Sequence, residues 1–289
     1  MHTHPSPMPG TLYVVATPIG NLEDISQRAL RVLGEVVLIA AEDTRRTGRL
    51  LEHYGIRTPT VSYHEHNRRT RGPQLLRRLE DGASVALVTD AGTPGISDPG
   101  TELVDECLQR GIPVDPIPGA SALLAAAMAS GFSLTPLTWL GFSPHRAKDL
   151  EKWYRGIEAT SHSVCFLESP HRIEASLRAA ANILGDRPIL VARELTKAHQ
   201  ELVRGPASMA LASLKSLKGE FTIVVGPRPA VATERETASD EEILAQFGQM
   251  EESGKFSSKR KLVAALADQH GRPTREIYAL VSKQRPAAE

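Results

Sequence analysis

The chain has 289 residues, of which 41% are apolar and only 4% aromatic, the balance of an ordinary globular protein with about two domains. Its 34 basic and 34 acidic side chains give a net charge of zero, so the overall charge indicates neither a nucleic-acid nor a membrane partner. Any such partner must bind a local patch of basic residues. The two cysteines lack metal-site or disulfide spacing, and no apolar run approaches the roughly 18 residues of a membrane span, so we expect a cytoplasmic protein.

The opening segment "MHTHPSPMPG" has neither the charged start nor the apolar run of a signal peptide. We therefore expect residues 1–10 to form a disordered leader. From residue 12 to residue 227, short β-branched runs alternate with segments of helical period, which predicts βα units around parallel sheets. The expected strands are 12–16, 36–41, 60–63, 85–89, 114–117, 138–142, 164–168, 189–192 and 221–225.

Capping residues and glycines predict where the helices begin and end. The polar residues expected to begin helices are Asn21, Asp98 and Ser169, the last two being followed by proline. The glycines expected to follow helix ends are Gly55, Gly111, Gly131 and Gly185. A boundary near Pro118 and Gly119 divides this region into an N-terminal α/β domain, 11–118, and a C-terminal α/β domain, 119–228.

After Gly226 the composition changes to a polar linker, 229–240, and then to a basic helical extension, 241–289. The spacing of Ala267, Gly271 and Ile277 is that of the helix contact, turn and core anchor of a helix-turn-helix, and Thr274 can cap its second helix. A generic basic helical hairpin is the alternative. The side chains expected to bind phosphates are Lys259, Arg260, Lys261, Arg272, Arg275 and Lys283.

A glycine-rich loop, "DAGTPGISDPG", follows the apolar run that ends at Val88. Such a turn exposes backbone N–H groups, but this one lacks the lysine of a phosphate loop and carries Asp90 and Asp98 instead. Two carboxylates suit ribose hydroxyls, an ammonium and a sulfonium, the groups of S-adenosylmethionine. The alternative is a tight turn with a purely structural role.

Seven ordered segments resemble one known family: "LYVVATPIGNLEDIS", "AAEDTRRTGRLLEHYGI", "SYHEHN", "DAGTPGISDPG", "PIPGASA", "FLESPHRI" and "EFTIVVGP". They are similar to the ribosomal RNA small subunit methyltransferase I family, within the tetrapyrrole methylase superfamily, over about residues 12–283. The resemblance implies an α/β fold of two α/β domains with S-adenosylmethionine in the cleft between them, plus a small helical extension. It also implies a homodimer and 2′-O-methylation of a cytidine in the decoding region of small-subunit (16S) ribosomal RNA.

The resemblance also implies which residues contact the cofactor. Thr93 departs from the aspartate of the superfamily, so Asp90 or Asp98 is expected to take over that contact, and Glu168 stands where relatives often place a methionine. Together with the loop argument, the expected cofactor contacts are Pro18, Asp90, Gly92, Thr93, Pro94, Ile96, Asp98, Ser121, Ala122, Glu168, Phe221 and Thr222.

Methylation of a ribose hydroxyl needs a group that accepts its proton. The candidates follow two expected strands and are Glu42, Asp43, Arg45 and His64. Arg45 suits a phosphate or a carboxylate, and His64 or an acid can accept the proton. Alternatively, Asp43 and Arg45 only brace the domain. His64 and His66 lack a well-placed third ligand, so no metal is expected.

Two other functions stay open. A tetrapyrrole or diphthine-type methyltransferase would use the same cofactor, although a small ring has no need of the basic extension. A non-catalytic, ligand-sensing regulator could bind nucleic acid through the helix-turn-helix, although the polar cluster at the strand ends exceeds what sensing requires.

Overall fold

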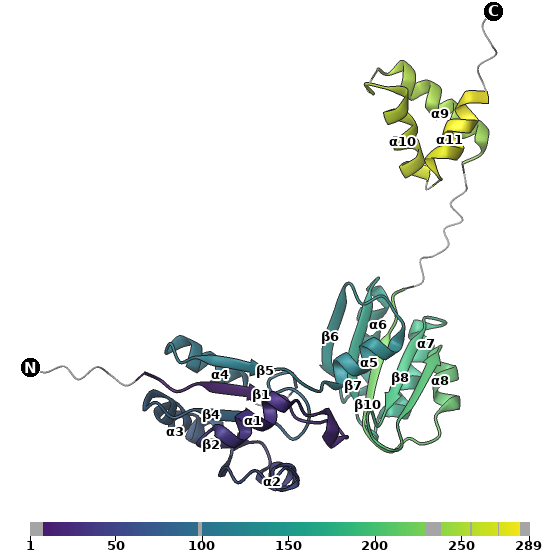
Figure 1. Cartoon of the computed structure of the whole chain (residues 1–289). Helices are drawn as coiled ribbons and strands as arrows, with labels where there is room; N and C mark the ends of the chain where they lie inside the picture. The colour runs from purple at the N-terminus through teal and green to yellow at the C-terminus, as the bar shows by residue number, and fades with distance from the viewer. Residues whose placement is uncertain (1–7, 98–99, 229–237, 255, 271, 284–289) are drawn as a thin grey trace, which may run out of the picture. The chain divides into compact units, whose positions relative to one another are not determined.

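The computed structural model describes residues 8–97, 100–228, 238–254, 256–270 and 272–283. The chain divides into two compact units, Met1–Arg228 and Pro229–Glu289, which are described separately (Figure 1). Among the described residues, no helix combines the length and the apolar content that crossing a membrane requires.

The first unit begins with a parallel sheet of strand order β3-β2-β4-β1-β5. Its strands are β1 (Leu12–Val15), β2 (Leu38–Ala41), β3 (Thr60–Ser62), β4 (Val85–Val88) and β5 (Val114–Ile117). The helices between them are α1 (Gln27–Glu35), α2 (Thr44–His53), α3 (Arg68–Glu80) and α4 (Thr101–Gln109). Parallel strands need such crossovers, which cover both faces of the sheet.

Strand β4 shows why the sheet carries continuous apolar runs. Val85 and Leu87 pack on one face with residues of α3 and α4, whereas Ala86 and Val88 pack on the other with residues of α1 and α2. Because successive side chains of a strand point to opposite faces, all four are buried. The central strand therefore supports two cores at once.

A second sheet of the same unit has the order β6-β7-β10-β8-β9. Its strands are β6 (Leu137–Phe142), β7 (Ser163–Glu168), β8 (Ile189–Arg193), β9 (Glu201–Gly205) and β10 (Phe221–Val225). Its helices are α5 (Ala122–Ser130), α6 (Ala147–Ala159), α7 (Ile173–Leu184) and α8 (Ala207–Ser213). Residues of α6, α7 and α8 pack on one face and residues of α5 on the other.

The expectation of a parallel sheet is wrong for this second half. Strands β6 and β7 run parallel, but β10 is antiparallel to both β7 and β8, and β9 is antiparallel to β8. Strand β9 was not predicted, because Leu202 and Arg204 are exposed and the alternation of buried and exposed residues is weak in so short an edge strand. The connection between β8 and β9 is short and reverses the direction of the chain, so the two strands are antiparallel. A parallel pair of strands would need a longer crossover connection, usually a helix.

One predicted helix start is confirmed for a shorter helix than expected, and one is wrong. Asn21 accepts a hydrogen bond from Glu23 N and caps only a 3-10 turn, Leu22–Asp24, whereas Ser26 caps α1. Ser169 precedes α7 by a full turn, since α7 begins at Ile173. Asp98 and Pro99 lie outside the described residues. All four glycine stops are confirmed, because each helix ends within two residues of its glycine.

The end of the expected leader is held in place. Residues 1–7 lie outside the described residues, but Gly10 is buried and its N–H donates to the Leu79 carbonyl at 2.8 Å. A Cβ at Gly10 would lie 2.3 Å from the carbonyl oxygen of Ala83, so the backbone approach requires glycine here.

The second unit contains α9 (Asp240–Glu252), α10 (Lys259–His270) and α11 (Thr274–Lys283). Most of the expected linker, 229–237, lies outside the described residues, as does Gly271. Ala267 and Ile277 are buried in one core with residues of α9, so the expected hairpin has a third helix packed against it. Thr274 is the first helical residue, and the Pro273 carbonyl accepts from Glu276 N at 2.9 Å.

Candidate functional site

The loops that follow β2 and β4 meet at one edge of the first sheet, as expected for neighbouring parallel strands. Asp90, after β4, accepts a hydrogen bond of 3.0 Å at Oδ1 from the backbone N–H of Asp43, after β2. In return, the Asp90 N–H donates to Oε2 of Glu42 at 3.2 Å. Oδ2 of Asp90 lies 3.3 Å from Arg46, which completes its set of partners.

A small cavity of about 60 Å³ lies between the loop after β4 and elements of the second half. Its walls are mostly apolar and include Ile19, Leu123, Trp139 and Leu167. Nε1 of Trp139 donates to the Ile96 carbonyl at 3.4 Å, a contact that joins the two halves. The residues expected to contact the cofactor that line this cavity are Gly92, Thr93, Ile96, Ser121 and Ala122.

Gly92 gives the cavity its shape. It has a φ of 86°, a conformation that favours glycine, and its N–H and carbonyl both bond to Thr17 in an antiparallel bridge. A Cβ at this position would lie 3.4 Å from Cγ2 of Ile19, another wall of the cavity. The backbone of the glycine-rich loop therefore forms part of the wall itself.

The other expected cofactor contacts lie elsewhere. Pro18 precedes the lining residue Ile19, and Pro94 is buried within the loop. Phe221 and Thr222 are buried in β10, with Thr222 opposite the lining residue Leu167. Asp98 lies outside the described residues.

Glu168 is enclosed by protein partners. Its side chain is 0% exposed, and it accepts from the Ser143 hydroxyl at 2.5 Å, from Ser169 N at 2.8 Å and from Arg172 Nε at 3.1 Å. Nη1 of Arg172 is buried without a hydrogen-bond partner among the described residues. This network joins the end of β7 to the start of α7.

A second, polar pocket of about 460 Å³ adjoins the small cavity, and Ser97 lines both. It brings together Glu42 and His64, two of the expected catalytic residues. Its other lining residues are Glu65, His66, Arg68, Thr101 and Glu102, and Arg68 forms an ion pair with Glu102. Acceptors and donors for a polar substrate therefore surround this space.

Asp43 and Arg45, the other two expected catalytic residues, pair with each other. Oδ1 of Asp43 accepts from Arg45 N at 2.8 Å and from Arg45 Nε at 3.1 Å, and Oδ2 accepts from Nη2 at 2.7 Å. The side-chain hydrogen bonds from Arg45 hold the pKa of Asp43 well below its usual range, so this carboxylate is a weak base. Asp43 also caps α2, which fits the bracing alternative.

Asn67 determines the tautomer of His64. The His64 backbone N–H donates to Oδ1 of Asn67 at 2.9 Å, so Nδ2 is the atom that donates to Nε2 of His64 at 3.2 Å. A neutral His64 then carries its proton on Nδ1, which is buried without a partner among the described residues. His64 also lines the polar pocket, but its Nδ1 is not accessible from it. Its centroid lies 6.0 Å from that of His66.

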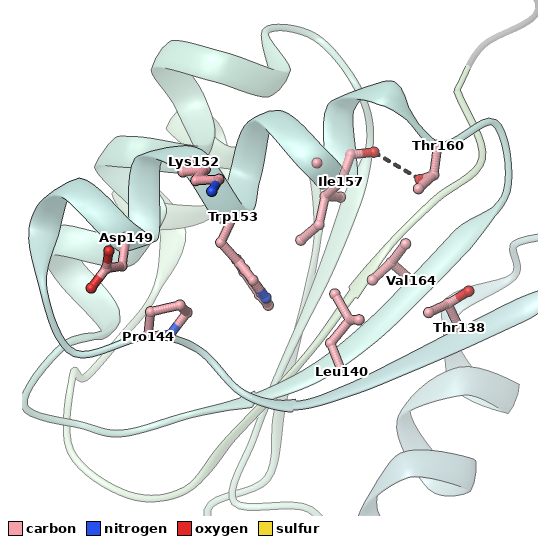
Figure 2. A pocket seen from close by; sticks show the side chains of 10 residues that line it. Thr138, Leu140, Pro144, Asp149, Lys152, Trp153, Ile157, Thr160 and Val164 are labelled. Carbon is pink, nitrogen blue, oxygen red and sulfur yellow. Dashed lines mark hydrogen bonds between the residues drawn. The ribbon is translucent and has the colours of Figure 1, made fainter.

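A third cavity, of about 400 Å³, lies between α6 and the edge strand β6 (Figure 2). Trp153, Leu140 and Val164 project into it, and Thr160 donates to the Ile157 carbonyl at its rim. None of the expected site residues lines this space, so it is separate from the polar strand ends.

Several residues of the two adjoining cavities were missed from the sequence. Leu123 directly follows the segment "PIPGASA", so that motif could have indicated it. Arg68 and Glu102 begin α3 and α4, helices 34 residues apart in the chain, and Trp139 lies in a strand outside the quoted motifs. Only the packing of these elements brings such residues to the site.

The second unit carries a basic groove of about 480 Å³ lined by Lys259, Arg260, Val263, Thr274, Arg275 and Tyr278. Arg272 instead bonds to Asp240 at 2.6 Å and lies 3.5 Å from Glu276, so its charge is used within the unit. Lys261 is exposed on α10. Lys283 ends α11, and its side chain is outside the described structure.

Comparison with known proteins gives two kinds of match. Residues 11–210 match the family model of tetrapyrrole (corrin/porphyrin) methylases. The chain is 42% identical over 274 residues to ribosomal RNA small subunit methyltransferase I of Synechocystis sp., covering 94% of this chain and 97% of that protein. It is 40% identical over 271 residues to the protein of that name from Bacillus subtilis, covering 93% of each.

Solved structures share the fold at low identity. Uroporphyrin-III C-methyltransferase from Thermus thermophilus matches with a TM-score of 0.54 and 18% identity, over 75% of this chain and 94% of that chain. A structure of that enzyme complexed with S-adenosylhomocysteine matches with a TM-score of 0.50 and 20% identity, over 75% and 97% of the two chains.

The Glu168 network predicts a large loss of stability when its charge is removed. In Glu168→Gln, the partly buried Arg172, whose Nη1 is inaccessible, loses its counter-ion, and we expect the free energy of unfolding to fall by about 3 kcal/mol. Urea unfolding followed by circular dichroism measures the change. The matched control is Glu174→Gln, an exposed i,i+4 partner of Arg178, for which a change of about 0.5 kcal/mol or less is expected. Equal effects of the two substitutions would mean that the buried pair does not stabilise the fold.

Proposed function

The chain belongs to the ribosomal RNA small subunit methyltransferase I family of the tetrapyrrole methylases, and on that basis we propose that it methylates the ribose 2′-oxygen of a cytidine in the decoding region of 16S ribosomal RNA. S-adenosylmethionine is the methyl donor. The structural observation that carries the proposal is the contact between an apolar cavity and a polar pocket across Ser97. Such a pair can hold a nucleoside cofactor and a second substrate side by side.

We assign the cofactor to the small cavity. Its apolar walls and the glycine backbone at Gly92 suit a flat nucleoside, and Thr93 and Ser121 offer hydroxyls. A volume of about 60 Å³ is below the roughly 300 Å³ of typical ligand pockets, so side chains such as Trp139 must move aside on binding. The bound cofactor would supply a methyl group already activated by the sulfonium.

We assign the ribose to the polar pocket, with Glu42 as the proton acceptor. The N–H of Asp90 donates to Oε2 of Glu42 at 3.2 Å, which holds the carboxylate in place. His64 lines the same pocket, and we propose that it helps to position the substrate there. Glu42 would take up the proton of the ribose hydroxyl as its oxygen accepted the methyl group from the bound cofactor, which would leave as the neutral thioether.

The remaining assignments concern binding. Arg45, whose side chain is 86% exposed, and the basic groove of the second unit are proposed to contact phosphates. We also propose a homodimer, as the resemblance implies. Leu124 and Met128 lie one turn apart on α5 and are 61% and 80% exposed, an apolar surface of the kind that subunits cover. We also propose that the protein is cytoplasmic, because its proposed substrate is a ribosomal RNA.

Incubation with radiolabelled S-adenosylmethionine tests the proposed reaction. Small ribosomal subunits, naked 16S ribosomal RNA and a tetrapyrrole precursor are offered in parallel, and the RNA is digested to nucleosides. We expect label in 2′-O-methylcytidine. Label in the tetrapyrrole alone, or no label in RNA under any condition, would refute the proposal.

The assignment of Glu42 predicts a selective loss of catalysis. Glu42→Gln keeps an oxygen that can accept from Asp90 N but cannot take up a proton, so we expect kcat to fall by about 100-fold or more while cofactor affinity stays the same. Single-turnover methylation and calorimetry measure the two quantities. If instead His64→Gln abolishes activity and Glu42→Gln does not, the imidazole is the acceptor.

The assignment of the small cavity predicts that Gly92→Ala weakens cofactor binding. The added methyl group would lie in ordinary van der Waals contact with Ile19 and would take up part of a cavity of only about 60 Å³. Overpacking of the ligand against this methyl group should cost about 1–3 kcal/mol, or about tenfold in affinity. Gly131→Ala is the matched control, because Gly131 also has a positive φ, of 65°, but a Cβ there meets nothing within 4 Å. Isothermal titration calorimetry with S-adenosylmethionine should show weaker binding for Gly92→Ala than for Gly131→Ala. Equal affinities would contradict the assignment of the cofactor to the small cavity.

A further inference from the structure

The basic groove of the second unit combines charge with an exposed aromatic ring. It lies along the first turns of α10 and α11, and its volume of about 480 Å³ is in the range of sites that hold a small organic ligand. Lys259 and Arg260 come from α10, and Arg275 and Tyr278 come from α11. The buried side chain of Val263 lies at its base.

The three cations of the groove are available to an anion. In the described part of the second unit, ion pairs engage Arg272 with Asp240 and Glu276, and none engages Lys259, Arg260 or Arg275. Nζ of Lys259 lies 5.5 Å from the centroid of the Phe247 ring, which holds its stem against the core. A groove with three unpaired positive charges favours a phosphate.

Tyr278 gives the groove a second chemical character. Its side chain is 53% exposed, whereas its neighbours Ile277 and Val281 are buried in the core of the unit. The core is therefore complete without this ring. An exposed aromatic ring beside phosphate-binding cations is the arrangement on which nucleic-acid bases stack.

The shape of RNA selects the kind of ligand. A helix-turn-helix reads DNA through the wide major groove of the B-form duplex, but the major groove of A-form RNA is too deep and narrow for side chains to read. A base that stacks on Tyr278 must also be unpaired. If the substrate is RNA, as the proposed function holds, the groove suits a single-stranded or looped segment.

We propose that the second unit binds an unpaired RNA nucleotide, with its base stacked on Tyr278 and its phosphates held by Lys259, Arg260 and Arg275. The proposal rests on the proposed function for the identity of the nucleic acid. This role differs from non-specific electrostatic attraction to phosphates, because stacking on Tyr278 requires a base that is not paired in a duplex.

Fluorescence anisotropy with the full-length protein tests the proposal. The probe is a labelled ten-nucleotide pyrimidine RNA, used as a single strand and annealed to its complement, without cofactor. We expect Tyr278→Ala to weaken single-strand binding by about tenfold and Tyr278→Phe, which keeps the ring, to stay within about twofold of the wild type. Arg275→Gln should reduce the slope of log K against log salt by about 0.7, the value for one phosphate of a single strand. The matched control Lys261→Gln removes a charge from α10 outside the groove and should change the affinity less than Arg275→Gln.

Two results would overturn the proposal. One is Tyr278→Ala with wild-type affinity for the single strand, and the other is equal losses for the single strand and the duplex. Circular dichroism checks that the variants keep their helices, as expected for an exposed side chain. The methylation assay separates this inference from the proposed function. If ribosomal RNA is labelled but Tyr278→Ala does not change single-strand affinity, the stacking proposal alone is overturned. If Tyr278→Ala weakens single-strand binding but ribosomal RNA is not labelled, the proposed reaction alone is overturned.

Discussion

The hydrogen bonds of Asp90 organise the edge of the first sheet on which the site is built. Its carboxylate accepts from Asp43 N, and its own N–H donates to Glu42, so the ends of β2 and β4 are locked together. Strand polarity alone would only bring these loops near one another. The reciprocal bonds give Glu42 a defined position. The glycine-rich loop that starts at Asp90 then lines the small cavity and, at Ser97, the polar pocket as well.

The two halves of the first unit divide the work at this edge. The parallel half supplies the loop backbone and the polar pocket, and the mixed half supplies apolar walls such as Leu123 and Trp139. A flat nucleoside needs walls on both sides, whereas a ribose needs hydrogen-bonding partners. The same loop contributes to both cavities because Ser97 lines each of them.

Much of this arrangement could be predicted where a local pattern has one structural solution. The run Val85–Val88 predicts a strand buried on both faces, and the glycines at helix ends are confirmed. Strand β9 was missed because an exposed edge strand carries little hydrophobic signal. Asp90 and Glu168 show the other limit. Asp90 was expected at the cofactor because of its carboxylate and Glu168 because of its place in a motif, and only three-dimensional packing reveals the protein groups that bond to both side chains. The pairing of Arg68 with Glu102 depends on packing in the same way.

Ser97 forms part of the wall of both cavities, and this has an evolutionary consequence. A larger side chain there would narrow the cavities on both sides, so changes at this position are pleiotropic. On the proposed assignment of the two cavities, a change at Ser97 selected for a different second substrate would also alter the fit of the cofactor. Diversification of such a site is easier at residues that face one cavity only, such as Glu65 and His66, while the shared wall constrains which variants remain functional.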